Sequence, residues 1–111
     1  MSTRRYALLI TNSEYDDGRL ARLTTPAADG IGLSEILKDP DICQFEKVEL
    51  LHNASAGKVR SRIAQFYQNR KRDDLLLLYF SGHGILDTNR KLYLAVKDTN
   101  SDLVRANGIA S

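Results

Sequence analysis

His83 is the residue whose chemistry stands out most clearly in this sequence. It follows the apolar run of residues 75–80 and is flanked by Gly82 and Gly84. An imidazole with a pKa of about 6.5 takes up and releases a proton at neutral pH, so it can act as a general base, a general acid or the partner of a thiol. A lone loop histidine is usually just solvated, but two flanking glycines permit a tight turn and close approach of another backbone to the ring. This context favours a functional role.

His83 cannot perform covalent chemistry without a nucleophile, and the chain offers poor candidates. Cys43, its single cysteine, precedes the second expected strand and should lie at the amino end of the sheet, whereas His83 lies at the carboxyl end. A strand of six residues separates those ends by about 20 Å. Cys43 is therefore interpreted as a half-buried structural thiol. Ser81 lacks the G-x-S-x-G turn of serine hydrolases and is interpreted as a turn residue.

The second histidine, His52, also follows an expected strand and so shares the same edge of the sheet. Neither glycines nor an acid lie beside it, which favours a role in the loop or at a helix start. The segment Ser81-Gly82-His83-Gly84 lacks the glycine spacing and the lysine of a phosphate-binding loop. No cofactor and no metal are implied by these residues.

The elements that must position His83 follow from the pattern of apolar residues. Short continuous apolar runs are typical of strands covered on both faces, and a recurrence of apolar residues every three or four positions predicts a helix. The expected strands are residues 6–10, 45–51 and 75–80, and the expected helices are residues 26–38 and a second one capped by Ser55 and ending near Arg70. Residues 85–86 and 92–96 flank a polar turn and predict an antiparallel ribbon. Residues 98–111 could begin a third helix but stop before burying anything.

The first helix is predicted from a row of apolar residues that fall roughly on one face. Pro26 lies near its start and residues 39–40, Asp-Pro, stop it, while Gly30 and Gly32 weaken it. The apolar residues of this face are Ala28, Ile31, Leu33, Ile36 and Leu37.

Strand, helix, strand, helix and strand in alternation predict an α/β fold. Right-handed crossovers would give a doubly wound, mostly parallel sheet inside a three-layer α/β/α sandwich. Sites in such sheets collect beyond the carboxyl ends of the strands, where His83 lies. A strand as apolar as residues 75–80 needs neighbours on both sides, yet no fourth parallel strand follows the ribbon. The fold is therefore expected to be truncated before that strand, the missing part following Ser111 or coming from another chain.

Composition is that of one small globular domain or a piece of one. The 111 residues include 16 Lys and Arg against 14 Asp and Glu, a net charge of +2. The basic cluster of residues 70–72 lies where a helix should end and complements its dipole, which favours a structural role over nucleic-acid binding. The longest apolar run is far short of the roughly 20 residues of a membrane span. A single cysteine and a start without a signal sequence predict a cytoplasmic protein with no membrane partner.

Over nearly its whole length the chain resembles the caspase-like clan of cysteine proteases, which includes caspases, metacaspases and bacterial caspase-like proteins. It is most similar to the bacterial caspase-like domains found at the front of multidomain proteins. The most specific block is the apolar strand that runs into Ser-Gly-His-Gly. The matching segments are residues 5–10 with Asn12 and Tyr15, then Leu20, Leu23, Pro26, Asp29 and residues 33–37, and finally residues 74–84.

The resemblance implies roles for particular residues. The family's catalytic histidine corresponds to His83, and the following glycine, here Gly84, offers its backbone N–H to the oxyanion. The nucleophilic cysteine comes one strand later, in a D-x-C motif at the end of the fourth parallel strand, and no such motif occurs here. Residues 1–111 would thus be the histidine-bearing N-terminal part of a cysteine endopeptidase domain that acts on proteins or peptides. It would be inactive without the C-terminal half that carries the cysteine.

The loop after the first strand forms part of the family's primary specificity pocket. In caspases an arginine there binds acidic substrates, and in metacaspases acidic residues bind basic ones. Here the loop offers both signs, with a lean towards a basic substrate, and the position nearest the caspase arginine is Leu23. The acidic residues are Glu14, Asp16 and Asp17, and the basic ones are Arg19 and Arg22.

A non-enzymatic module is the rival hypothesis, either a degenerate protease used as a scaffold or a doubly wound regulatory domain. The sequence beyond Ser111 would discriminate, because an apolar strand ending in D-x-C supports the protease.

Overall fold

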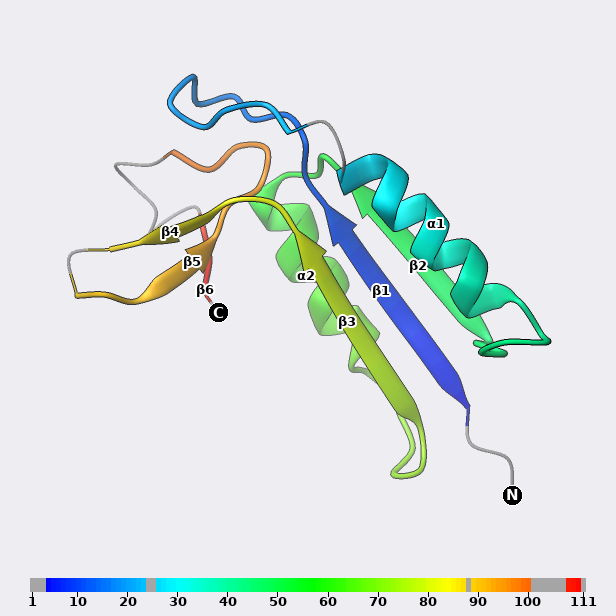
Figure 1. Ribbon diagram of the computed structural model, residues 1–111. Coiled ribbons are helices and arrows are strands. Elements are labelled where there is room, and N and C mark those ends of the chain that lie inside the picture. Colours follow the sequence, from blue (N-terminus) through cyan, green and yellow to red (C-terminus); the bar gives the residue numbers. More distant parts are fainter. Residues whose placement is uncertain (1–3, 24–25, 88, 101–107, 111) are drawn as a thin grey trace.

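A parallel sheet of three strands, in the order β2-β1-β3, forms the centre of the molecule (Figure 1). The computed structural model describes residues 4–23, 26–87, 89–100 and 108–110. The elements, in chain order, are β1 (Arg5–Thr11), α1 (Pro26–Lys38), β2 (Lys47–His52), α2 (Ala56–Phe66), β3 (Leu75–Ser81), β4 (Gly84–Leu86), β5 (Leu92–Leu94) and β6 (Ile109–Ala110). Their order and the parallel pairing confirm the α/β fold predicted from the sequence.

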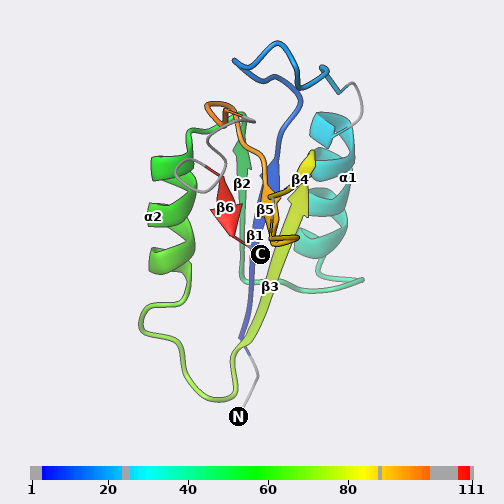
Figure 2. The ribbon, with the colours of Figure 1, turned by 90° about the vertical axis from the view of Figure 1, so that its left-hand side faces the viewer.

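The central strand, β1, is buried on both faces. Residues 7–10 are each at most 2% exposed. Because successive side chains of a strand point to opposite faces, Leu8 and Ile10 pack in the core on the α2 side, while Ala7 and Leu9 pack with residues of α1. The two helices accordingly lie on opposite faces of the sheet (Figure 2). The result is the predicted three-layer sandwich, in which both helical layers pack against the central strand β1.

The apolar face predicted for α1 is wrong in part. Ile31 and Ile36 were assigned to it, yet their side chains are 51% and 49% exposed. Leu37 is buried as predicted, but the other buried positions are Gly30 and Ser34, and the spacings of four and three residues place all three on one side of the helix. Small residues at two of these positions let the helix backbone approach the sheet closely, which a count of apolar residues cannot reveal.

Gly30 and Gly32 offer a matched test of this close approach. A methyl group added at Gly30 would lie 2.8 Å from Cγ2 of Thr11 and 3.1 Å from Cδ1 of Leu50, whereas one added at Gly32 meets nothing within 4 Å. Alanine within a helix is favoured over glycine by about 0.8–1 kcal/mol. Urea unfolding should show that Gly32→Ala stabilises the protein by roughly this amount. Gly30→Ala should lower the free energy of unfolding, and equal gains in both variants would contradict this packing.

The second helix starts as predicted but ends earlier. Ser55 is its N-cap, with Oγ accepting from the backbone N–H of Lys58 at 3.3 Å. The predicted end near Arg70 is wrong, because the helix ends at Phe66. Arg70 lies beyond the helix and contacts its last residue. Its Nε donates to the carbonyl of Phe66 at 2.7 Å, and its guanidinium lies 3.9 Å from the centre of the Tyr6 ring. Arg70 thus satisfies a helix-end carbonyl, in line with a structural role for the basic cluster.

Strand β3 is less covered than its composition predicts. It pairs with β1 along one edge, and within the described ranges no strand pairs with its other edge. Leu75 and Leu78 are 49% and 40% exposed. This open edge agrees with the prediction that the described residues lack the fourth parallel strand, which would cover β3 on that side.

An antiparallel ribbon follows β3, as predicted, and the described residues of the tail, 98–100 and 108–110, contain no helix. Residues 109–110 form β6, which pairs with β5, and Ile109 is 8% exposed in the same core as Leu8. The tail therefore does bury a side chain, contrary to expectation, and residues 101–107 lie outside the described part.

Candidate active site

The strand register places three chain segments at one edge of the sheet. Thr11, the last residue of β1, lies opposite His52 of β2 and opposite Ser81 of β3. The connections that leave these strands therefore meet beyond their carboxyl ends. His83 lies two residues after β3, at this edge, where open α/β sheets collect their sites.

The ring of His83 is oriented by a backbone carbonyl of the β1–α1 connection. Its Nε2 lies 2.7 Å from the carbonyl oxygen of Ala21. A carbonyl oxygen only accepts hydrogen bonds, so Nε2 carries the proton and donates it. In the neutral imidazole, Nδ1 then holds the lone pair, and it is the nitrogen that can take a proton from another group.

Tyr15 holds the same histidine by two further contacts. The backbone N–H of His83 donates to the phenolic oxygen of Tyr15 at 2.9 Å, and the ring centres lie 5.1 Å apart at an interplanar angle of 50°. Burial raises the pKa of the Tyr15 phenol, and the hydrogen bond from His83 opposes this with a smaller effect. The phenol is therefore neutral at physiological pH. It contributes geometry to the site and no charge.

Gly82 leaves the space that the phenol occupies. A methyl group at Gly82 would lie 2.7 Å from Oη of Tyr15 and 3.2 Å from Cβ of Asn12, and the backbone has a positive φ of 157° there. The sequence predicted close approach of another backbone to the ring, and the carbonyl of Ala21 lies 2.7 Å from Nε2. In addition, a tyrosine hydroxyl and a buried asparagine approach Gly82 itself. The sequence drew attention to Asn12 and Tyr15 only through the family pattern, without a role for either.

Gly84 begins β4, and the pairing pattern indicates where its N–H points. The N–H of Ala95 donates to the carbonyl of His83 at 2.8 Å, and the next residue, Gly84, lies opposite Leu94. Hydrogen-bonded and non-hydrogen-bonded pairs alternate in antiparallel ladders. The pair of Gly84 and Leu94 is therefore of the second type, in which the N–H of Gly84 points away from β5.

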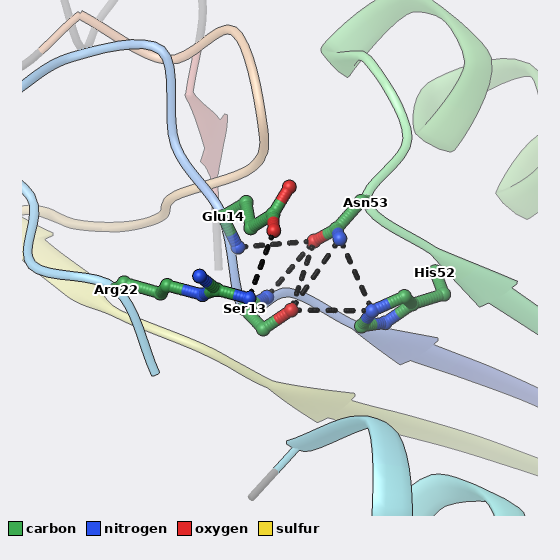
Figure 3. Close-up of polar contacts among 5 residues, drawn as sticks. All are labelled: Ser13, Glu14, Arg22, His52 and Asn53. Atoms are coloured by element: carbon green, nitrogen blue, oxygen red, sulfur yellow. Dashed lines mark hydrogen bonds and ion pairs between the residues drawn. The ribbon is translucent and has the colours of Figure 1, made fainter. Parts of the chain in front are cut away.

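A second polar cluster ties the loop after β1 to the end of β2 (Figure 3). His52 contacts the hydroxyls of Thr11 at 2.7 Å and Ser13 at 3.2 Å, the first through Nδ1 and the second through Nε2. Asn53, in a left-handed conformation with φ 53°, accepts the N–H groups of Ser13 at 2.9 Å and Glu14 at 3.1 Å. None of the contacts of His52 is with a carboxylate. They fit the loop role assigned to this residue from the sequence.

The charged residues of the loop after β1 are largely paired with one another. Glu14 contacts Arg22 at 3.2 Å (Figure 3), and Asp17, whose side chain is 8% exposed, contacts Arg19 at 3.1 Å. Asp16 has the longest contact, 3.9 Å to Lys97.

Leu23 is half-buried and its N–H donates to the carbonyl of Ser13 at 2.8 Å, which closes the loop. Asp16, by contrast, has a side chain that is 65% exposed and therefore faces water with its charge largely available.

Cys43 lies at the opposite end of the sheet. Its carbonyl accepts from the guanidinium of Arg5, the first residue of β1, and its side chain packs partly buried against the α1-side core. Seven residues of strand, about 20 Å, separate the two ends of β1. The sequence prediction of a structural thiol remote from His83 agrees with this placement. Ser81 ends β3, and its carbonyl accepts from the backbone N–H of Asn12 at 2.9 Å, as expected of a residue leading into a turn.

The part of the chain that the structure describes contains neither a metal-binding cluster nor a membrane-spanning helix. No group of three or more His, Cys, Asp or Glu side chains could hold a metal ion there. The helices found there are too short or too polar to span a membrane.

Comparison with known proteins places these features in a family. The family model described as the caspase domain matches residues 4–110, which is nearly the whole chain. No curated protein matches the sequence. The mostly parallel sheet with helices on both faces agrees with that match. The chain belongs to the caspase-domain family.

Proposed function

We propose that this chain supplies the proton-transferring half of a cysteine endopeptidase site. Caspase-family domains are in general cysteine peptidases that act on proteins. The observation that carries the proposal here is the 2.7 Å contact between Nε2 of His83 and the carbonyl of Ala21, because it leaves Nδ1 as the proton acceptor. A histidine fixed in one tautomer at the carboxyl edge of the sheet is suited to activate a thiol.

The reaction follows from these groups once a thiol faces Nδ1. His83 takes the thiol proton, and the thiolate attacks the peptide carbonyl carbon to form a C–S bond. The negative oxygen that results lies towards the N–H of Gly84, which stabilises it. The C–N bond then breaks as His83 returns the proton to the leaving amine. Water hydrolyses the thioester, with His83 as the base, and the thiol is regenerated.

The thiol comes from a segment other than the one described, since Cys43 lies at the far end of the sheet. The open edge of β3 supports a further parallel strand, pairing beside it and ending at the same edge as His83. An apolar hollow of about 490 Å³ between α2, β3 and the ribbon supports cover by the same segment. Its apolar lining comes from Ile63, Ala64, Leu78, Leu94, Ile109 and Ala110. The partner is thus the cysteine-bearing half of the domain.

We infer a basic side chain as the preferred substrate feature. Glu14 and Asp17 are committed to Arg22 and Arg19, and those pairs neutralise each other. Asp16 is the carboxylate of this loop with the weakest contact and the most exposed side chain, and it directly follows Tyr15. Its charge therefore favours an arginine or lysine side chain near His83.

Peptide hydrolysis by the full-length protein, here meaning this chain together with the cysteine-bearing half whether that half follows Ser111 or is a separate chain, tests this function. Peptides with arginine at the cleaved position should be hydrolysed, and alkylation of the thiol should stop the reaction. Asp16→Asn should reduce cleavage of arginine peptides by about tenfold while that of aspartate peptides does not fall. Hydrolysis of neither peptide by protein with an intact thiol would favour a non-catalytic scaffold.

A further inference from the structure

Tyr15 contacts His83 at both its backbone and its ring. The phenolic oxygen accepts the N–H of His83, while Ala95 donates to the carbonyl of the same residue, so the peptide groups on either side of the histidine are both fixed. The imidazole lies tilted against the Tyr15 ring, with the ring centres 5.1 Å apart, and its Nε2 lies 2.7 Å from the carbonyl oxygen of Ala21. The ring therefore has little freedom to rotate away from the Ala21 carbonyl.

The backbone on both sides of Tyr15 is itself anchored. The N–H of Glu14 donates to the side chain of Asn53 at 3.1 Å (Figure 3), and the N–H of Asp16 donates to the carbonyl of Lys97 at 2.8 Å. These anchors come from the β2–α2 connection and from the segment after β5. A tyrosine has two side-chain torsions, so anchoring its backbone fixes the hydroxyl at low entropic cost.

We propose that Tyr15 is a positioning residue for catalysis, which holds His83 in the tautomer and orientation that leave Nδ1 free for the thiol. This inference rests on the proposed peptidase function. Tyr15 acts through His83 and does not touch the reacting atoms. The absence of a side chain at Gly82 is part of the same arrangement, because a methyl group there would overlap the phenolic oxygen.

Tyr15→Phe in the full-length protein tests the proposal, since it removes the hydroxyl and keeps the ring. The loss of one oriented hydrogen bond predicts a fall in kcat of about three- to tenfold with KM within twofold. Nitrogen NMR of labelled histidine, with the His83 signals assigned from a His83→Gln variant, should show a change from one tautomer to a mixture. Tyr67→Phe is the control, because Tyr67 is 51% exposed at the end of α2.

The two readouts separate this inference from the function on which it rests. If cleavage depends on His83 but kcat and the His83 signals are unchanged in Tyr15→Phe, the positioning role is wrong and the peptidase function stands. If His83 is not needed for cleavage but its tautomer changes in Tyr15→Phe, the hydroxyl positions the ring and the proposed function fails. A merely structural role predicts lower stability with the His83 signals of the folded protein unaltered.

Discussion

Replacing His83 with alanine should reduce peptide hydrolysis by the full-length protein by at least about a hundredfold. General acid–base catalysis by a positioned side chain is commonly worth 10² to roughly 10⁴ in rate. The imidazole is held with Nε2 on the Ala21 carbonyl, and the alanine variant leaves no group to accept the thiol proton. The measurement is kcat/KM on an arginine-containing peptide, at a pH near neutrality.

His52→Ala is the matched control for this loss. His52 is the chain's other histidine and lies at the same edge of the sheet, where it contacts the hydroxyls of Thr11 and Ser13. Its removal should leave kcat/KM within about threefold, with a modest loss of stability from the broken contacts. An equal loss of hydrolysis in both variants would mean that the assay follows the integrity of this edge and not proton transfer by His83.

Gly82→Ala is expected to lower the free energy of unfolding by about 1–3 kcal/mol and to reduce hydrolysis as well. The added methyl group meets Oη of Tyr15 at 2.7 Å and Cβ of Asn12 at 3.2 Å, on a backbone with a positive φ. To relieve this overlap the Tyr15 phenol must move, and its oxygen then no longer accepts the N–H of His83. Denaturant unfolding and the peptide assay measure the two effects on the same protein.

A double-mutant cycle with Tyr15→Phe separates the overlap from the backbone strain. Removing the hydroxyl removes the shortest contact, so Gly82→Ala should cost less in the phenylalanine background, with a coupling energy of about 1 kcal/mol. Gly57→Ala, where an added methyl meets nothing within 4 Å, is the control for glycine replacement itself. Strict additivity of the two changes would show that the Tyr15 hydroxyl does not occupy the space over Gly82.

The fold could be predicted where local patterns and burial agree. The run that became β1 is apolar because both of its faces are covered, and Ser55 carries a capping side chain at the right place. β2 was predicted as residues 45–51 and spans Lys47–His52, because the N–H of Phe45 bonds back to the carbonyl of Leu37. Such turn contacts shift element ends without changing their type.

The strand order predicts where the site lies, but not which residues orient the imidazole of His83. His83 at the carboxyl edge follows from the alternation of strands and helices. Its contacts with Tyr15 and Ala21 span more than 60 residues of sequence and depend on the path of an irregular loop. No periodic pattern encodes that path, so the contact with Ala21 emerges from the structure alone, and the family pattern named Tyr15 without giving it a role.

The most direct measurement of the central claim is the geometry around His83 in a crystal structure of the full-length protein. We predict a cysteine sulfur within about 4 Å of Nδ1, on the side away from the Ala21 carbonyl, with Nε2 still bonded to that carbonyl. A structure in which no thiol reaches the imidazole, or in which Nε2 faces the thiol and Nδ1 the carbonyl, would contradict the account.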